Sequence, residues 1–186
     1  NFNFYIENIF EIFKIWKGGM SFHGGLVGVA ISILIFSKKN NLDYIIYFDT
    51  VSAVAPIGLF FGRISNFING ELYGTPTLKP WGVIFPKIDF ISRHPSQIYE
   101  ALLEGVVLFT ILNLLIFLRR NSVGFISCIF LILYGLFRIL CESFREPDNH
   151  LGYVWGDYTM GTLLSMIMIL FGLVFFLKIK YANKNK

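Results

Sequence analysis

Ionisable and polar side chains gather in four short segments of this sequence, each beside a long apolar stretch. The segments are GGMSFHGG around His23, GRISNFINGELYG at 62–74, SRHPSQIYEALLEG at 92–105 and YGLFRILCESFREPD at 134–148. Polar groups at the depth of a bilayer are costly, and they usually serve a ligand or a partner. Arg63 and Arg138 are the two arginines expected at head-group depth, and a guanidinium binds phosphate oxygens through two parallel N–H donors. The four segments therefore favour a site for a phosphate-bearing ligand.

Helical spacing places several of these side chains on common faces. One face carries Tyr134, Arg138 and Glu142, each four residues after the last, and positions so spaced lie above one another on a helix. Arg138 could bind a ligand, or it could pair with a glutamate of another helix and simply hold the two helices together. The remaining polar candidates are Asn66, Asn69, Glu71, Gln97, Glu100 and Glu104, of which the last two are the possible partners of Arg138.

Two further residues suit structural roles. His94 precedes Pro95 and so lies in a turn before a helix, although it stays a secondary candidate for the site. Asp49 is expected to hydrogen-bond within the protein near a bend at Pro56. No metal site and no cofactor are predicted, because His23 and His94 come from separate segments and the sequence has neither an HExxH pattern nor a phosphate-binding glycine loop.

The composition places the chain among membrane proteins. Of its 186 residues, 55% are hydrophobic and only 15% are charged, with a mean hydropathy of +0.62. A soluble domain of this size could not cover so much apolar surface. The lysines and arginines stand at the ends of apolar stretches rather than among aromatics on one face, which argues against a nucleic-acid partner.

Five apolar stretches approach the ~20 residues that a membrane-spanning helix needs. They cover residues 22–37, 44–61, 98–118, 123–141 and 158–177. We expect an all-α, polytopic bundle of about five spans, forming a single transmembrane domain over residues 1–186 with a small loop region. Residues 1–16 mix aromatics with charges and are predicted to lie along the membrane surface as an amphipathic segment.

Positive charge predicts the orientation of these spans. Lys38 and Lys39 follow the first stretch, Arg119 and Arg120 follow the third, and KIKYANKNK follows the fifth. Cytoplasmic loops carry the excess of Lys and Arg. The C-terminus is therefore expected in the cytoplasm, with the loops at 63–97 and 142–157 facing outward. In this topology all four polar segments meet in the outer half of the membrane.

The same four segments closely resemble those of the prolipoprotein diacylglyceryl transferases, bacterial inner-membrane enzymes. GGMSFHGGLVG, GRISNFINGELYG, RHPSQIYEALLEG and YGLFRILCESFREPD occur in that family's order, and MGTLLSMIMILFG resembles its last helix. The resemblance implies a seven-helix protein with its N-terminus outside, of which this chain would lack the first two spans. The loop between Gly74 and Arg93 looks shorter than in better-known members.

Such enzymes transfer the diacylglyceryl group of phosphatidylglycerol to the lipobox cysteine of a secreted precursor, so that a thioether forms and glycerol phosphate leaves. The resemblance implies that Arg63 and Arg138 hold the phosphate and that His23 either deprotonates the thiol or donates a hydrogen bond to the phosphate. A non-catalytic protein that binds or carries anionic phospholipid is the alternative function. The lipid-binding set implied by the resemblance is Arg63, Asn66, Glu71, Gly74, Tyr134, Arg138 and Glu142, with Glu71, Glu100, Glu104 and Glu142 orienting the arginines.

Overall fold

A computed structural model describes residues 22–118, 122–147, 153–155 and 158–184. The predicted surface segment at 1–16 lies outside the described residues. The chain divides into two compact units, residues 1–44 and 45–186. The first unit holds helix α2, Phe22–Asn40, which ends on Lys38 and Lys39. The elements of the second unit form the rest of the fold.

Each of the five apolar stretches is helical, which confirms the predicted all-α membrane fold. In the second unit the long helices are α3 (Tyr44–Asn69), α6 (Phe125–Glu142) and α7 (Met160–Lys184). Between them runs one continuous helix made of α4 (Ser96–Glu100), the π-helix η3 (Ala101–Val107) and α5 (Leu108–Phe117). Within the described residues, these four helices are long and apolar enough to cross a membrane.

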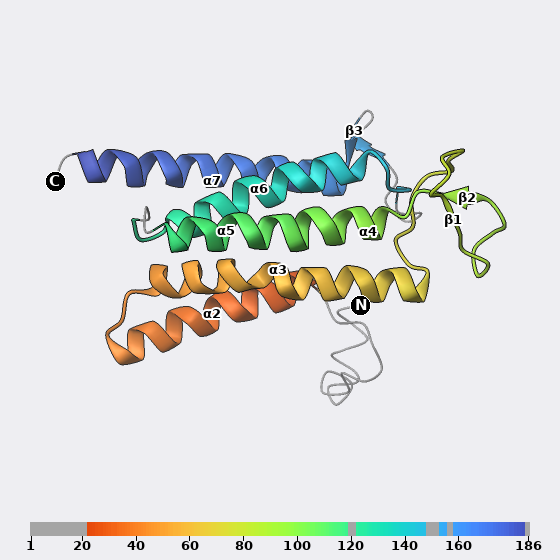
Figure 1. Ribbon diagram of the computed structural model, residues 1–186. Helices are drawn as coiled ribbons and strands as arrows, with labels where there is room; N and C mark the ends of the chain where they lie inside the picture. Colours follow the sequence, from red (N-terminus) through yellow and green to blue (C-terminus); the bar gives the residue numbers. More distant parts are fainter. Residues whose placement is uncertain (1–21, 119–121, 148–152, 156–157, 185–186) are drawn as a thin grey trace. The chain divides into compact units, whose positions relative to one another are not determined.

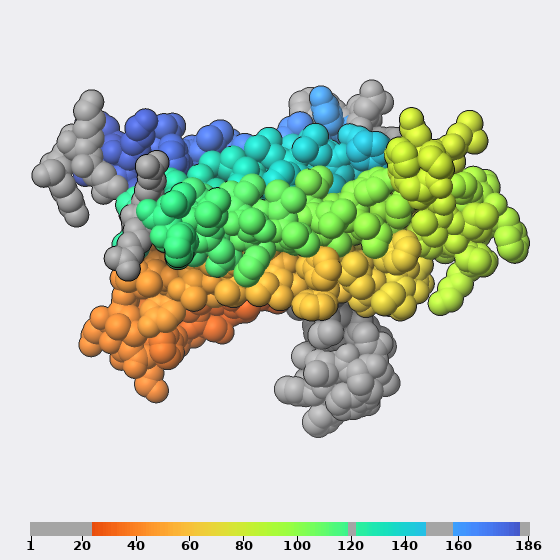
Figure 2. Space-filling view, in the orientation of Figure 1, coloured from red at the N-terminus to blue at the C-terminus, as the bar shows by residue number. Residues whose placement is uncertain are grey.

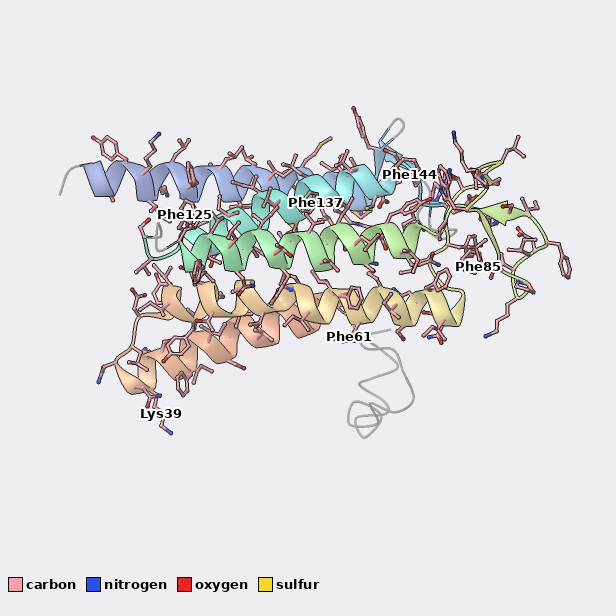
Figure 3. All side chains as sticks on the ribbon, in the orientation of Figure 1. Lys39, Phe61, Phe85, Phe125, Phe137 and Phe144 are labelled. Carbon is pink, nitrogen blue, oxygen red and sulfur yellow. The ribbon has the colours of Figure 1, made fainter. Side chains whose placement is uncertain are left out.

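The four long helices of the second unit run lengthwise beside one another (Figure 1). Ala53, Leu108, Leu112 and Ile126 form the buried core between α3, α5 and α6. Phe125 and Phe137 of α6 belong to the partly buried layer around it (Figure 3). Many large apolar side chains point outward instead, among them Phe61, at 65% exposed, and Phe117, at 81%. Outward apolar side chains are expected of a protein whose solvent is lipid.

Helix α3 continues beyond the end expected from the sequence. The apolar stretch ends at Phe61, but the helix runs on to Asn69. It ends there because Gly70 adopts a positive φ of 74° and Glu71 donates its backbone N–H to the carbonyl of Asn66 at 2.9 Å, the usual way a glycine terminates a helix. The loop predicted at 63–97 is therefore shorter, since residues 63–69 are helical and α4 begins at Ser96.

Short strands cap one end of this unit. Strands β1 (Val83–Ile84) and β2 (Ser92–Arg93) pair antiparallel, and β3 (Tyr153–Trp155) pairs with β4 (Tyr158–Thr159). The segment of residues 76–93, here called the β1–β2 hairpin, projects beyond the helices (Figure 2). Backbone bonds tie its base to the end of α6, where Thr75 donates to the carbonyl of Phe144 at 3.0 Å.

Candidate active site

Two arginines from different helices meet two buried glutamates of a third. Arg63 of α3 lies 3.0 Å from Glu100 and 3.0 Å from Glu104. Arg138 of α6 forms an ion pair with Glu100 and lies 3.9 Å from Glu104. The pairing of Arg138 with Glu100 or Glu104, which the sequence left open, is therefore present. These contacts hold α3, α4, η3 and α6 together at the end of the bundle that carries the hairpin.

Glu100 is the centre of this arrangement. Besides Arg63 and Arg138, its carboxylate lies 3.5 Å from Nη1 of Arg145, which follows α6. Glu142 pairs with Arg138 at 2.7 Å and accepts a 2.6 Å hydrogen bond from Thr159. We call these six charged residues the arginine cluster; its members are Arg63, Arg138, Arg145, Glu100, Glu104 and Glu142.

Two glutamates of the arginine cluster are fully buried, whereas the side chains of Arg63, Arg138 and Glu142 are partly exposed. The side chains of Glu100 and Glu104 are 0% exposed, whereas those of Arg63 and Arg138 are 13% and 12% exposed. An anion that reaches this place can therefore contact the side chains of Arg63 and Arg138, while the carboxylates of Glu100 and Glu104 are inaccessible to it. Each guanidinium has five N–H donors, more than its glutamate partners use, so donors remain for phosphate oxygens.

The π-helix explains how both glutamates reach the arginines. Fully buried positions recur every fourth residue along this helix, at Ser96, Glu100, Glu104, Leu108 and Leu112. In an α-helix of 3.6 residues per turn, four residues advance the face by about 40°, so these positions would drift around the helix. A π-helix closes its hydrogen bonds over five residues instead of four and therefore turns less per residue. The η3 segment keeps the five positions on one face.

The other predicted residues of this region occupy different places. Asn66 and Tyr134 lie one turn from Arg63 and Arg138 on the same helices and are half-buried. Glu71 has no ion pair with an arginine among the described residues, so its predicted role stays a prediction. Its side chain is exposed, and its backbone carbonyl accepts a 2.6 Å hydrogen bond from the buried amide of Gln97. Asn69 is exposed at the end of α3.

Gly74 is required by packing. A Cβ atom at this position would lie 2.3 Å from the carbonyl oxygen of His94 and 2.6 Å from that of Phe144, both backbone atoms that cannot move aside. His94 itself hydrogen-bonds through Nδ1 to the hydroxyl of Tyr99 at 3.1 Å and packs edge-on against Phe144. His94 therefore joins the hairpin base to α4 and α6, as expected of a structural turn residue.

His23 lies within α2, but its side chain is outside the described residues. Its meeting with the arginines stays a prediction. Among the residues that the structure describes, no group of three or more His, Cys, Asp and Glu side chains could hold a metal ion. The chemistry that the described residues can supply is binding of an anion by guanidinium groups, with the carboxylates fixing their positions.

Comparison with known proteins decides the family. The family model described as prolipoprotein diacylglyceryl transferase matches residues 1–178. The chain belongs to the prolipoprotein diacylglyceryl transferase family. A phosphatidylglycerol–prolipoprotein diacylglyceryl transferase of Wolbachia pipientis wMel is 50% identical over an alignment of 187 positions that covers 97% of this chain and 71% of that protein. Proteins of the same name from Rickettsia bellii (strain OSU 85-389) and Azospirillum brasilense are each 51% identical, covering 98% and 92% of this chain and 70% and 66% of their own lengths.

One member of the arginine cluster in this transferase-family chain, Arg145, was not among the predicted site residues. Arg145 lies three residues after Glu142 and seven after Arg138, a spacing that a helical reading extended past Glu142 would have included. Asp49 was expected to be structural, but its partners were not foreseen. It accepts hydrogen bonds from the backbone of Gly124 at 2.7 Å and of Ser127 at 2.8 Å, and so caps the start of α6 from a neighbouring helix.

Proposed function

We propose that this multi-pass membrane protein transfers the diacylglyceryl group of phosphatidylglycerol to the lipobox cysteine of prolipoproteins in the bacterial inner membrane. The activity is that of its family. The observation that supports its location is the arginine cluster, in which the partly exposed side chains of Arg63 and Arg138 pair with the fully buried carboxylates of Glu100 and Glu104. The cluster is positioned for the phosphate of the lipid, within a bundle whose apolar outer surface suits its acyl chains.

The reaction makes one bond and breaks another. The cysteine sulfur attacks the glyceryl carbon that carries the phosphate, so a carbon–sulfur bond forms, the carbon–oxygen bond breaks and glycerol phosphate leaves. Negative charge grows on the leaving phosphate, and fixed guanidinium groups stabilise it. Arg63 and Arg138 serve this role, while Glu100, Glu104 and Glu142 hold them in place. Asn66 and Tyr134, one turn away, are assigned to the oxygens of the head group.

His23 is assigned to the thiol or to the phosphate. A free thiol has a pKa of about 8.5, so at neutral pH it needs a base or a positive field to become the thiolate that attacks. The glycines around His23 allow a substrate to approach its backbone closely. As a base, His23 takes the proton of the thiol. As a hydrogen-bond donor, it binds the phosphate, and the positive field that favours the thiolate then comes from the arginines.

The orientation of the protein is part of this proposal. The basic clusters at alternate span ends support a cytoplasmic C-terminus and an arginine cluster facing the outer leaflet. A cysteine introduced at Thr77 should then be labelled by a membrane-impermeant reagent added outside cells, and one at Asn185 should not. The opposite pattern would contradict the orientation.

Turnover in vesicles tests the activity. Phosphatidylglycerol and a lipobox peptide should yield a thioether-linked peptide and glycerol phosphate. Arg63→Lys and Arg138→Lys keep the positive charge but lose the two parallel N–H donors of the guanidinium. Each should reduce kcat by about 10²-fold, as expected for loss of a donor that stabilises charge in the transition state. Arg93→Lys is the matched control: Arg93 pairs with Asp89 of the hairpin and with Glu146 after α6, and within the described residues it forms no ion pair with the cluster's glutamates. Equal activity of all three variants would refute phosphate binding by the cluster, and absence of glycerol phosphate release would refute the transferase.

A further inference from the structure

The β1–β2 hairpin exposes an unusual number of apolar side chains. Within its 18 residues, Leu78 is fully exposed and Phe90 is 83% exposed. Trp81, Ile84, Ile88 and Ile91 are between 43% and 55% exposed. A cluster of exposed apolar side chains marks a surface that contacts a partner or a membrane.

These side chains are held in place by a well-packed base. Phe85 is buried and packs against Phe67 of α3, with ring centroids 5.8 Å apart. The indole N–H of Trp81 donates to the hydroxyl of Tyr99 of α4 at 2.8 Å. The hairpin is therefore fixed to the ends of two helices, and its apolar side chains point outward from an ordered scaffold.

The attachment points lie at the depth of lipid head groups. Helix α3 has 26 residues and is about 39 Å long, against ~30 Å for the hydrocarbon core, so its end reaches the head-group region. Phe67, to which the hairpin is fixed, stands two residues before that end. Trp81 and Tyr99 are of the two residue types enriched at the membrane–water interface, where the ring is apolar and its polar atom meets water.

The charges of the hairpin are complementary to anionic lipid. Lys79 and Lys87 are exposed, and Nζ of Lys79 lies 6.0 Å from the Trp81 ring. Asp89, the one acidic residue of the hairpin, is engaged by Arg93 at 2.7 Å. The charges left for a partner are thus positive. Lysines near an anionic membrane surface are attracted to it, and their apolar stems can remain among apolar neighbours.

We propose that the β1–β2 hairpin docks on the lipid surface beside the arginine cluster. Its apolar side chains lie at the boundary between the head groups and the acyl chains, and Lys79 and Lys87 contact anionic head groups. An apolar peptide could cover the same side chains, but it would leave the two lysines without partners. The hairpin then gathers anionic phospholipid next to the arginines.

The first test places an environment-sensitive fluorophore at Phe90→Cys, with Ile84→Cys as a second position. The full chain is placed in nanodiscs of phosphatidylcholine with 30% phosphatidylglycerol and no peptide. Both probes should emit at short wavelength and be quenched by spin-labelled lipid, whereas a probe at Lys39→Cys, on the exposed end of α2, should be unquenched. Water-like emission at both hairpin positions would overturn the proposal. So would shielding that develops only when a lipobox peptide is added, which would make the hairpin a peptide-binding surface.

The second test addresses the lysines. Spin-labelled phosphatidylglycerol should quench the probe at position 90 about fivefold more than spin-labelled phosphatidylcholine, the preference expected of a lysine at an anionic surface. The Lys79→Gln/Lys87→Gln pair should remove this preference, and Lys178→Gln/Lys180→Gln, which removes two charges at the end of α7, should leave it unchanged. A preference that survives loss of Lys79 and Lys87 would overturn their assignment. Neither test uses turnover, so the docking surface can fail while the transferase activity stands.

Discussion

Glu100→Gln removes one negative charge from the centre of the arginine cluster while keeping the shape of the side chain. In the native protein the charges of Arg63, Arg138 and Arg145 are balanced by those of three glutamates. The substitution leaves one guanidinium charge unbalanced in a site where Glu100 is fully buried. Breaking a buried ion pair by removing one partner costs about 3–5 kcal/mol, because the remaining charge is left without compensation.

The assay is equilibrium unfolding of the full chain in mixed micelles. Glu100→Gln should lower the free energy of unfolding by about 3–5 kcal/mol. Glu146→Gln is the control, since Glu146 is 37% exposed and its partner Arg93 keeps a second carboxylate; this change should cost less than about 1 kcal/mol. The two variants differ in the burial of the carboxylate that is lost.

Phosphatidylglycerol should then restore part of the lost stability. Its phosphate is a replacement anion for the unbalanced guanidinium, so the lipid should raise the free energy of unfolding of Glu100→Gln more than that of the native protein. Phosphatidylcholine, which carries no net charge, is the matched lipid. If Glu100→Gln were as stable as Glu146→Gln, the cluster would not depend on a charged Glu100. If the anionic lipid stabilised variant and native protein equally, the cluster would not be its phosphate site.

Three other predictions concern His23, Asp49 and Asp89. If His23 is the base, the activity of His23→Gln relative to native protein should recover as the pH rises from 6 to 9 towards the pKa of the thiol, and a constant ratio in the pH–rate profile would contradict the base role. Asp49→Ala should lower the free energy of unfolding by about 2 kcal/mol, through loss of the α6 cap, while kcat of the folded protein is unchanged; a fall in kcat would link this cap to the site. The guanidinium of Arg93 lowers the pKa of Asp89 by hydrogen bonding, so this pair stabilises the hairpin above the ordinary Asp pKa of about 4 and stops doing so as the pH falls below the lowered value. Hydrogen exchange of the hairpin, corrected for the intrinsic rate, should increase there, and an increase of the same size in Asp89→Asn would refute this origin.

Much of the fold and of the cluster could be predicted because membrane proteins obey strong local rules. A spanning helix needs a long apolar stretch, so the helices were found by composition alone. For Arg138 the sequence predicts either of two roles, ligand binding or pairing with Glu100 or Glu104, because a charge at that depth needs a partner. Arg63 was placed in a loop by the end of the apolar stretch at Phe61, although the helix continues to Asn69. An apolar stretch shows which part of a helix lies within the lipid, and the helix can continue beyond that part.

What the sequence did not predict depends on contacts between distant segments. The carbonyl of Glu71 accepts a hydrogen bond from Gln97, which follows 26 residues later, at the turn that Gly70 makes. Asp49 caps a helix that begins 75 residues later, at Gly124. Arg145 belongs to the cluster because the segment after α6 packs against Glu100. Of these features only Arg145 has a local signal, its helical spacing after Arg138 and Glu142.

The π-helix has a consequence for changes in the length of the chain. Its wider turns hold more residues over the same rise than an α-helix would. A one-residue deletion in an ordinary spanning helix rotates everything beyond it by about 100°, which would turn Leu108 and Leu112 away from the core. The same deletion within Ala101–Val107 can be absorbed by conversion of the π-turn to an α-turn, with the core register kept. This segment is therefore where the helix can tolerate an insertion or deletion during evolution. Glu104 lies within it, so the deletion that spares the fold would still move the carboxylate that Arg63 binds.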